Sequence, residues 1–435
     1  MKKDQRLLAV KVLNKFDNTN KKLQLVRDQI LISLNSFNKS YVVASTNDII
    51  RLKGRLDLLI FKISKKKLYQ INKKLINILR LGFYEILYCA KIPKYATVNS
   101  LVNLAKSMTN RKAAGYINFI LRKLILEIEK KDIFEKYKKL SDWNSFPQWM
   151  QKRWEKNFGK DNCLRLINYF NRKQGLYVRI NSNVEYEKIL GSLYGEGLSF
   201  EVFSKNFIRF DNGINQLLKT SQFKNGLISI QDPAAGAVVN LLDLNKGDVV
   251  LDVCAAPGTK SFYISEIIGP EGKVYAYDSD EQRIKIAKSD SSRNSLNNII
   301  WKKKDAKIDN YPISKKILVD VPCTGTGVLG KKPDIKWRRN PCDIDEMSQL
   351  QFQILQNMSK FLEIGGIIIY STCSLEKEEN WDVVELFLKY NVNFKLVKIT
   401  NFLYPGWIDL NGCLMTIPYK HKVSGIFAAK LKKYA

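Results

Sequence analysis

Residues 251–260 read Leu-Asp-Val-Cys-Ala-Ala-Pro-Gly-Thr-Lys, an apolar run that breaks into a turn containing proline and glycine. From residue 231 to the end of the chain, similar apolar runs alternate with amphipathic stretches. We expect short strands at residues 248–253, 273–278, 316–320 and 367–371. We expect helices between them at residues 261–268, 281–294 and 345–362. This alternation predicts an α/β fold with a doubly wound parallel sheet, in which ligands bind at the carboxyl ends of the strands.

The chain before this sheet divides into three further parts. Apolar residues recur near a helical period up to residue 140, so residues 1–140 are predicted to form an all-α domain. Residues 141–160 are rich in turn-forming and aromatic residues and are interpreted as a linker. Short strand patterns around one helical stretch predict a small α+β subdomain over residues 161–230, which leaves residues 231–435 for the doubly wound domain.

Positive charge is concentrated in the predicted helical domain. Residues 1–150 carry 31 lysines and arginines against 11 acidic residues, whereas the rest of the chain carries 41 against 31. A basic excess in one domain favours a polyanionic partner, and nucleic acid is the leading candidate. Lysine, asparagine and isoleucine are abundant throughout the chain, so charge alone does not establish the partner.

Other features of the composition argue against several classes of protein. The seven cysteines are unevenly spaced and suggest neither a disulfide framework nor a zinc site, so no metal is expected. His421 is the only histidine, which argues against a Ser/His/Asp triad. The first residues lack the apolar core of a signal peptide, and no apolar run is long enough to cross a membrane. We therefore expect a cytoplasmic protein with no membrane partner. We also expect it to be a monomer.

The turn at residues 254–260 has the features of a ligand-binding turn. Its proline–glycine pair allows the backbone to approach a ligand closely, and Lys260 is placed to meet a carboxylate. Asp278 ends the next predicted strand, where an acid can hold ribose hydroxyls. Asp305 follows a third strand pattern and could meet an adenine amine. Taken alone, residues 254–260 could also be a turn with a purely structural role. The acids at the ends of successive strands favour the interpretation as a cofactor site.

Two cysteines follow the last two predicted strands. Cys323 lies in the sequence Asp-Val-Pro-Cys-Thr-Gly, which begins at Asp320, and Cys373 lies in Tyr-Ser-Thr-Cys-Ser. Because parallel strands end at one edge of a sheet, the acid and both thiols are expected around a single pocket. We expect Ser374 to cap a helix that starts after Cys373, and a helix N-terminus lowers the pKa of a thiol.

Residues 325–330 form a literal Gly-x-Gly-x-x-Gly pattern, which is also found in dinucleotide-binding turns. Pro333 follows where the helix of such a turn would begin, so the sequence argues against a hydride-transferring enzyme. We expect these glycines to form a mobile loop over a substrate.

One acid and two thiols suit the methylation of cytosine at carbon 5. That carbon becomes nucleophilic only after a thiolate adds to carbon 6, and an acid near ring nitrogen 3 stabilises the developing charge. Once the methyl group is in place, carbon 5 loses a proton and the thiol is eliminated, a step that a second thiol can assist. The target base must leave its stack, so an unpaired stretch of nucleic acid is the expected substrate.

With these residues, the chain resembles the bacterial ribosomal RNA cytosine-5 methyltransferases of the RsmB (Sun/Fmu) group, within the Nop/Sun RNA methyltransferase family. The resemblance covers essentially the whole chain and is strongest at residues 252–260, 278–283, 320–327, 333–337, 372–374 and 378–380. It implies a Rossmann-like class I methyltransferase sheet, S-adenosylmethionine as the co-substrate and 16S ribosomal RNA as the partner. It also implies that the N-terminal helices form an RNA-binding domain similar to NusB.

The resemblance implies roles for individual residues as well. Cys373 would be the nucleophile, Cys323 would assist product release, and Asp320 would contact the target base. The residues expected to hold S-adenosylmethionine are Cys254, Ala255, Ala256, Pro257, Gly258, Thr259, Lys260, Asp278, Arg283, Asp305 and Asp320. Two residues depart from the family pattern: Thr259 stands where glycine is usual, and Lys332 stands where close relatives usually have histidine. The threonine puts a close approach of the backbone to the cofactor in question.

Three other functions compete with this interpretation. A transfer-RNA cytosine-5 methyltransferase shares the core motifs, although the NusB-like domain favours ribosomal RNA. A non-catalytic RNA-binding ribosome-assembly factor would have no need of two strand-end thiols, Lys260 and the cofactor acids. A small-molecule methyltransferase would need neither the thiols nor the basic helical domain.

Overall fold

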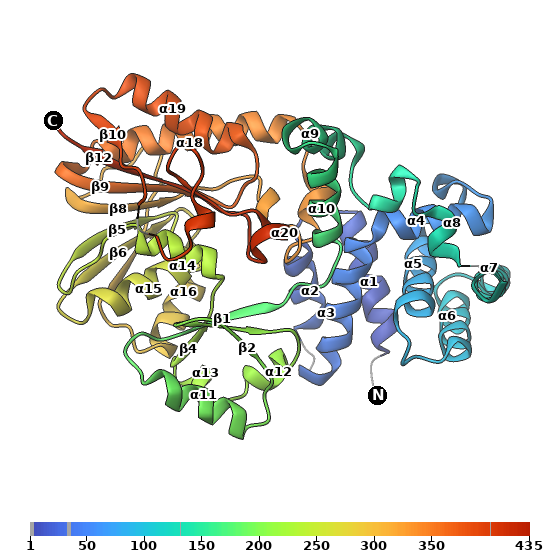
Figure 1. Cartoon of the computed structure of the whole chain (residues 1–435). Coiled ribbons are helices and arrows are strands. Elements are labelled where there is room, and N and C mark those ends of the chain that lie inside the picture. The colour runs from blue at the N-terminus through green and yellow to red at the C-terminus, as the bar shows by residue number, and fades with distance from the viewer. Residues whose placement is uncertain (1–3, 33–35, 131, 401) are drawn as a thin grey trace. The chain divides into compact units, whose positions relative to one another are not determined.

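The computed structural model describes residues 4–32, 36–130, 132–400 and 402–435 (Figure 1). The chain divides into two compact units. The first comprises Met1–Lys173 together with Leu329–Arg339, and the second comprises Gln174–Val328 and Asn340–Ala435. The domain limits predicted at residues 140, 160 and 230 stay predictions.

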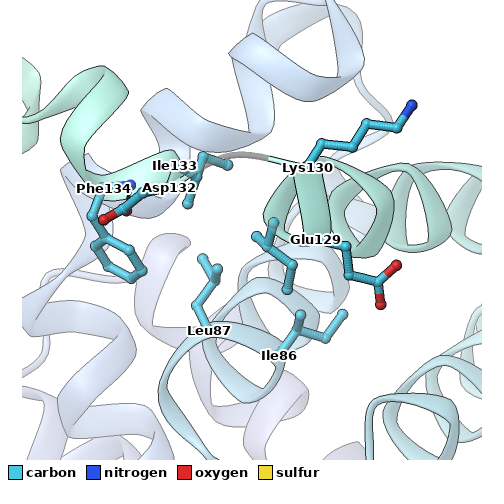
Figure 2. Close-up of a pocket in the computed structure, with 8 residues that line it drawn as sticks. Ile86, Leu87, Glu129, Lys130, Asp132, Ile133 and Phe134 are labelled. Carbon is cyan, nitrogen blue, oxygen red and sulfur yellow. Dashed lines mark hydrogen bonds between the residues drawn. The ribbon is translucent and has the colours of Figure 1, made fainter.

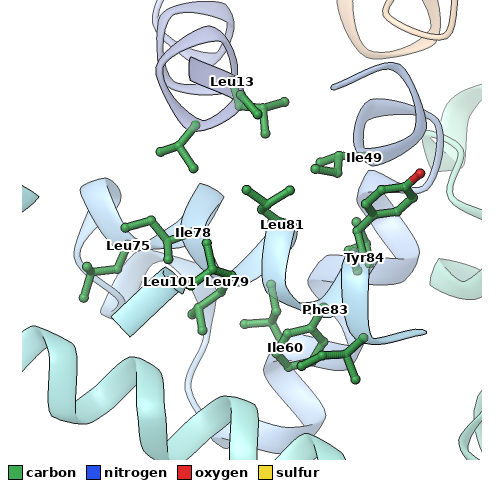
Figure 3. Close-up of a cluster of buried hydrophobic side chains, with 14 of the residues drawn as sticks. Leu13, Ile49, Ile60, Leu75, Ile78, Leu79, Leu81, Phe83, Tyr84 and Leu101 are labelled. Atoms are coloured by element: carbon green, nitrogen blue, oxygen red, sulfur yellow. The ribbon is translucent and has the colours of Figure 1, made fainter. Parts of the chain in front are cut away.

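The first unit is built from helices whose apolar faces meet in one core. In chain order, with η marking 3-10 helices, they are α1 (Gln5–Asp17), α2 (Leu23–Leu31), α3 (Ser36–Arg51), α4 (Lys53–Ser64), η1 (Leu68–Gln70), α5 (Lys73–Tyr88), α6 (Lys94–Met108), α7 (Arg111–Lys130), α8 (Ile133–Tyr137), η2 (Ser141–Asn144), α9 (Gln148–Phe158) and α10 (Lys160–Phe170). Helix α5 is buried around most of its circumference and contacts α1, α3, α4, α6 and α7. Figure 3 shows Leu81 of α5 facing Leu13 and Ile49 in this core. Gly82 lets α7 approach α5, because a Cβ atom there would come within 2.6 Å of Leu121.

A segment from the second half of the sequence completes the first unit. It contains α17 (Ile335–Arg338), whose Lys336 is 1% exposed. The Lys336 ammonium donates to the carbonyl oxygen of Arg51 at 2.7 Å and to Asn171 at 3.1 Å. Trp337 donates to the carbonyl oxygen of Ile50 at 2.7 Å. Burial, together with nearby arginine charges, lowers the pKa of Lys336 well below its usual value.

Within the described ranges of the second unit, the smaller of two sheets has four antiparallel strands in the order β2-β3-β1-β4. Its strands and their helices are β1 (Leu176–Ile180), α11 (Tyr186–Gly195), β2 (Glu201–Ser204), β3 (Phe207–Phe210), α12 (Ile214–Leu217), α13 (Ser221–Lys224) and β4 (Ile228–Ile230). This is the small α+β arrangement that the sequence predicts.

The larger sheet has the order β10-β12-β9-β8-β5-β6-β7, with β11 paired to β12. The strands of this sheet and the helices that connect them are α14 (Pro233–Asn240), β5 (Val249–Val253), α15 (Thr259–Ile268), β6 (Lys273–Asp278), α16 (Glu281–Arg293), β7 (Ile299–Lys303), β8 (Ser314–Asp320), η3 (Thr326–Val328), α18 (Cys342–Ser359), β9 (Leu362–Thr372), η4 (Lys377–Glu379), α19 (Trp381–Tyr390), β10 (Phe394–Leu396), η5 (Pro405–Trp407), β11 (Leu414–Met415), α20 (Pro418–His421) and β12 (Phe427–Lys433). Strands β7, β6, β5, β8 and β9 are parallel, whereas β12 runs antiparallel to β9.

Both faces of the larger sheet are covered, as the apolar character of its strands requires. In Figure 1 helices α14, α15 and α16 lie on one face, and α18 and α19 lie on the other. Alternate residues of β5 follow this division, because Val250 packs in the core beneath α14 and α15, whereas Leu251 and Val253 pack in the core beneath α18 and α19. The doubly wound α/β fold is therefore confirmed.

Two details of the sequence prediction are wrong. The sheet is mixed rather than wholly parallel, because β12 returns beside β9 in the antiparallel direction. The helix expected at 345–362 ends at Ser359, and Leu362 already begins β9. That strand extends N-terminally past Gly365 and Gly366, residues that weaken a strand pattern in the sequence.

A buried ion pair joins the smaller sheet of the second unit to helix α15, which covers one face of the larger sheet. Arg179 of β1 and Glu266 of α15 both have fully buried side chains, and Nη2 of Arg179 donates to Oε1 of Glu266 at 2.8 Å. The guanidinium also donates to Gln231 and lies 4.3 Å from the ring centre of Tyr263. We predict that Arg179→Ala lowers the free energy of unfolding by about 3–5 kcal/mol, because it leaves a buried carboxylate without its partner.

The matched control is Arg209→Ala, which removes a partly exposed arginine paired with Glu201 and Asp211. Loss of a surface ion pair costs about 1 kcal/mol or less. Urea denaturation of both variants measures the difference, and equal losses in the two would contradict the role assigned to the buried pair.

Candidate functional site

The pairing of three parallel strands brings the predicted site residues to one edge of the larger sheet. Strand β8 lies between β5 and β9, and their residues pair in register. In this register Asp320, the last residue of β8, stands beside Ser371 of β9. The turn after β5 and the two cysteine loops therefore leave the same edge, which is where α/β sheets bind ligands.

Asp320 connects β8 to strand β9 and to helix α15. Its Oδ2 atom accepts a hydrogen bond from the Lys260 ammonium at 2.6 Å, and its Oδ1 atom accepts one from the Ser371 hydroxyl at 2.7 Å. Burial is the largest single effect on Lys260 and opposes its charge, but the Asp320 carboxylate and the other nearby groups together raise the pKa of the lysine above its usual value. Cys373 and Asp252 act in the same direction. The lysine thus stays a cation beside the acid and the thiol.

The two thiols lie together beyond the ends of β8 and β9. The sulfur atoms of Cys323 and Cys373 are 3.1 Å apart. The hydrogen bond to Cys373, together with burial, raises the pKa of the Cys323 thiol well above its usual value. Cys323 therefore holds its proton and can donate it toward the sulfur of Cys373.

The expectation that Ser374 caps a helix is wrong. Residues after it form the 3-10 turn η4, and α19 begins only at Trp381. The Ser374 hydroxyl instead donates to Glu379 at 2.8 Å and accepts from the backbone N–H of Glu376 at 3.1 Å. A helix N-terminus therefore does not act on Cys373.

The glycine loop after Cys323 is packed rather than open. The backbone N–H of Gly327 donates to the carbonyl oxygen of Cys373 at 3.0 Å, and Gly327 accepts from Gly425 at 2.8 Å. Gly327 is buried, and a side chain there would collide with the backbone of Gly425. Thr326 is also buried and accepts from the backbone N–H of Leu375 at 2.9 Å. These contacts tie the loop to the segment that carries Cys373, and a position of the loop over a substrate stays a prediction.

The turn after β5 has the backbone conformation of a ligand cradle. Cys254 has a φ of 62° and Gly258 a φ of 103°, both in the left-handed region. Thr259 begins α15, and its carbonyl oxygen accepts from Gln231 at 3.1 Å. The first N–H groups of α15 thus follow directly on a sharp turn at the edge of the sheet, as in sites that bind nucleotide-like ligands.

Asp278 holds this turn from the end of β6. Its carboxylate accepts from the backbone N–H of Ala256 at 3.1 Å and forms an ion pair with Arg283 at 3.1 Å. Arg283 also donates to the carbonyl oxygen of Ala256. Asp278 is 2% exposed. Through these contacts with the N–H and carbonyl groups of Ala256, the acid and the arginine together hold the turn in place.

Asp252, within β5, carries an unusual carboxyl group. Its Oδ2 atom accepts from the Ser261 hydroxyl, whereas Oδ1 is buried and has no hydrogen-bond partner among the described residues. Burial, together with the charges of Asp320 and Asp278, raises the pKa of Asp252 to about 7. A buried polar atom without a partner beside the turn fits a site that receives a polar ligand.

Asp305 stands apart from the other candidates. It is exposed beyond the end of β7, and its carboxylate accepts from the backbone N–H of Lys307 at 2.9 Å. This local hydrogen bond is typical of a loop aspartate. The structure therefore brings together the turn at 254–260, Asp278, Arg283, Asp320, Cys323 and Cys373, and it places Asp305 outside this set of contacts.

Three residues of the site were not identified from the sequence: Ser371, Gln351 and Glu379. Ser371 holds Asp320, and Gln351 donates to the carbonyl oxygen of Pro322 at 2.9 Å. Glu379 accepts from the residues that follow both cysteines. Of these three residues, only Glu379 lies in a stretch on which the family resemblance rests, so only Glu379 could have been identified from the sequence.

Other features of the described residues add no second site. They contain no group of histidine, cysteine and acidic residues arranged to hold a metal ion. No described helix is long and apolar enough to cross a membrane. A surface pocket in the first unit lies between α5, the end of α7 and α8 (Figure 2), and its lining, largely isoleucine, leucine and phenylalanine, includes none of the predicted site residues.

Comparison with known proteins gives two family matches and several relatives. The family "16S rRNA methyltransferase RsmB/F" matches residues 239–432, and the NusB family matches residues 3–126. The chain is 30% identical over 397 residues to the probable ribosomal RNA small subunit methyltransferase B of Synechocystis sp., covering 88% of this chain and 89% of the relative.

Two solved structures are similar as well. The crystal structure of PH0851 is 25% identical, covers 100% of both chains and has a TM-score of 0.79. The methyltransferase homolog protein from Pyrococcus horikoshii is 26% identical, has a TM-score of 0.58, and is similar over 67% of this chain and 96% of its own.

The raised pKa of Asp252 predicts a pH dependence of stability. The folded protein keeps the proton up to a pH of about 7, whereas the unfolded chain releases it near the ordinary value of 3.8. Stability from this group is therefore complete below 3.8 and falls as the pH rises toward 7. Asp252→Asn removes the titration, so its stability relative to the unmodified protein should rise across this window, by on the order of 1.4 kcal/mol per pH unit, and level off above it.

Urea denaturation at pH values between 4 and 8 measures this difference. Asp345→Asn, at an exposed position on α18, is the control, and its difference should stay small and flat. A flat difference for Asp252→Asn as well would contradict the assignment of a protonated, buried carboxyl group.

Proposed function

The chain belongs to the RsmB/F family of small-subunit ribosomal RNA methyltransferases, and we propose that it forms 5-methylcytosine in 16S ribosomal RNA through a covalent cysteine adduct. The family is one of S-adenosylmethionine-dependent enzymes, and a NusB-type region precedes the methyltransferase region. The choice of cytosine, the attack at carbon 6 and the identity of the nucleophile are parts of the proposal.

The observation that carries the proposal is the pair of thiols 3.1 Å apart at the ends of adjacent strands. Methylation of an exocyclic amine or of a ribose hydroxyl needs no nucleophilic sulfur. Addition to carbon 6 needs one thiolate, and elimination at the end needs a proton acceptor or donor close to the same base. Two adjacent thiols next to the Lys260–Asp320 pair meet this need.

We assign the addition to Cys373 and the release step to Cys323. The sulfur of Cys373 would form a bond to carbon 6 of the ring, which makes carbon 5 nucleophilic. Asp320 and Lys260 would hold the pyrimidine ring and offset the charge that develops on it. Cys323 keeps its own proton in the resting site; as the bond between Cys373 and carbon 6 breaks, it would pass that proton to the departing sulfur of Cys373 and take the carbon 5 proton in its place.

We infer that S-adenosylmethionine, which supplies the methyl group, is held by the turn at residues 254–260 and by Asp278. Asp278 would bind ribose hydroxyls, since it ends the strand next to the turn and already orders the turn through Ala256. Arg283 would orient Asp278. Asp305 is exposed at the end of the following strand, and contact with the adenine remains its predicted role.

The direct test is methyl transfer from labelled S-adenosylmethionine to purified small-subunit RNA, with bisulfite mapping of the product. A single protected cytosine in 16S RNA supports the proposal. Label in transfer RNA alone would keep the chemistry but contradict the substrate. No label in either RNA would favour an assembly factor that binds RNA without modifying it.

We predict that Cys373→Ala abolishes methylation and leaves the affinity for S-adenosylmethionine within about threefold of normal. The turn at residues 254–260 follows β5 and runs into α15, Asp278 ends β6 and Arg283 lies on α16, whereas Cys373 follows β9. Calorimetry measures the affinity, and Cys342→Ala, which removes an exposed thiol, is the control. Retained methylation in Cys373→Ala would contradict the assignment of the nucleophile.

We predict that Cys323→Ala accumulates a covalent protein–RNA adduct, because addition proceeds and elimination is impaired. Denaturing gel electrophoresis after incubation with RNA and S-adenosylmethionine shows such an adduct as a band of reduced mobility. Normal turnover without an adduct would remove Cys323 from the mechanism.

A further inference from the structure

Glu379 is a buried acid with an unusual set of hydrogen bonds. It ends the 3-10 turn η4 and is 0% exposed. One carboxylate oxygen accepts from the backbone N–H of Thr324 at 2.7 Å and from Gln351 at 3.1 Å. The other accepts from the hydroxyl of Thr324 and from the hydroxyl of Ser374 at 2.8 Å. Four donors from three separate segments thus converge on one carboxylate.

The donors belong to the two cysteine loops. Thr324 directly follows Cys323, and Ser374 directly follows Cys373. The two hydroxyls also lie 3.3 Å from each other. Because Glu379 binds the neighbour of each thiol, its carboxylate fixes the two loops relative to one another next to the 3.1 Å contact between the sulfur atoms.

A further layer of hydrogen bonds holds Glu379 itself. Gln351 of α18 donates to the carbonyl oxygen of Pro322 at 2.9 Å as well as to Glu379. The hydroxyl of Tyr370 donates to the carbonyl oxygen of Glu379 at 2.5 Å and to Gln351 at 3.1 Å. Burial raises the pKa of Glu379, and the hydrogen bonds from Thr324, Ser374 and Gln351 act against this rise.

The chemistry of the donors explains why an acid occupies this position. A backbone N–H, an amide N–H and two hydroxyls all point toward it, and an ionised carboxylate offers two oxygen atoms that only accept. A glutamine could serve in part, because its oxygen can accept from the backbone and its amino group can donate to the hydroxyl oxygens. An alanine would leave all four donors without their acceptor.

We propose that Glu379 is a positioning residue that sets the separation and orientation of the Cys323 and Cys373 thiols, an inference that rests on the proposed cysteine chemistry. In that chemistry one sulfur bonds to carbon 6 while the other serves carbon 5 of the same base, so the two must stay adjacent. Displacement of reacting groups by about 1 Å commonly costs about 100-fold in rate.

The test measures the distance between the thiols apart from the RNA reaction. Diamide, an azo oxidant, takes one hydrogen from each of two adjacent thiols and leaves a disulfide and a hydrazine. In the full chain without RNA, peptide mapping by mass spectrometry follows the formation of the Cys323–Cys373 disulfide. We expect Glu379→Ala to slow this reaction by about tenfold or more and to lower kcat for RNA methylation at least as much, with KM for S-adenosylmethionine changed by less than about twofold.

Two further variants separate positioning from a general loss of structure. Glu379→Gln should recover most of both rates, because its oxygen can accept from the backbone N–H of Thr324 and from Gln351, while its amino group donates to the two hydroxyl oxygens, which then act as acceptors. Glu385→Gln makes the same change of charge at an exposed position of α19 and should match the unmodified protein in both rates. If Glu379→Ala does not fold, Thr324→Val and Ser374→Ala each remove one hydroxyl donor, and each should slow disulfide formation.

The outcomes distinguish this inference from the proposed function. Normal disulfide formation and normal kcat in Glu379→Ala, or unchanged disulfide rates in both hydroxyl variants, would overturn the positioning role even if the unmodified protein methylates cytosine. Slow disulfide formation in Glu379→Ala, restored in Glu379→Gln, would support the positioning of the thiols even if the unmodified protein transfers no methyl group to cytosine. That last result would contradict the proposed function alone.

Discussion

The parallel pairing of β8 with β9 is the constraint on which the site depends. In this register Asp320 stands beside Ser371, and the chain then continues from each strand into a cysteine loop. Successive residues of a strand point to opposite faces, so a slip of one residue would turn Asp320 away from Lys260 and separate the two sulfurs. The register is strongly specified because both faces of β8 and β9 are buried beneath helices.

Buried carboxyl groups are the second feature of this region. Asp252, Asp278 and Glu379 are almost completely buried, and the structure compensates each in a different way. Asp278 has Arg283 and backbone N–H groups, and Glu379 has four neutral donors. Asp252 has one hydroxyl donor and retains a proton up to a pH of about 7. Loss of one hydrogen-bond partner from a buried carboxyl group costs free energy of folding. The partners therefore hold the turn and the cysteine loops in place.

The sequence was most informative where local pattern determines structure. Strand β6 lies at the residues that its apolar run predicted, and the turn after β5 and both cysteines lie at the predicted sheet edge. The antiparallel return of β12 was missed because the residues between 391 and 426 carry no periodic signal that shows direction. The role of Ser374 was misjudged because a serine before acidic residues also occurs in a turn without a helix.

Contacts between distant segments were beyond the sequence argument. Glu379 accepts from Thr324, 55 positions away, and no periodicity encodes such a pair. The residues 333–337 looked like part of the methyltransferase half, yet they pack inside the helical unit through Lys336 and Trp337. In the sequence these residues indicated only the family resemblance. The structure shows which residues they contact.

The central claim is that Cys373 forms a covalent bond to cytosine, and adduct mapping tests it most directly. RNA containing 5-fluorocytidine can accept the thiol and the methyl group but cannot lose fluorine from carbon 5, so the adduct persists. After incubation with S-adenosylmethionine and nuclease and protease digestion, mass spectrometry identifies the modified peptide. The account predicts a methylated fluorocytosine on Cys373. An adduct on Cys323 alone, or methylated RNA without any adduct, would contradict it.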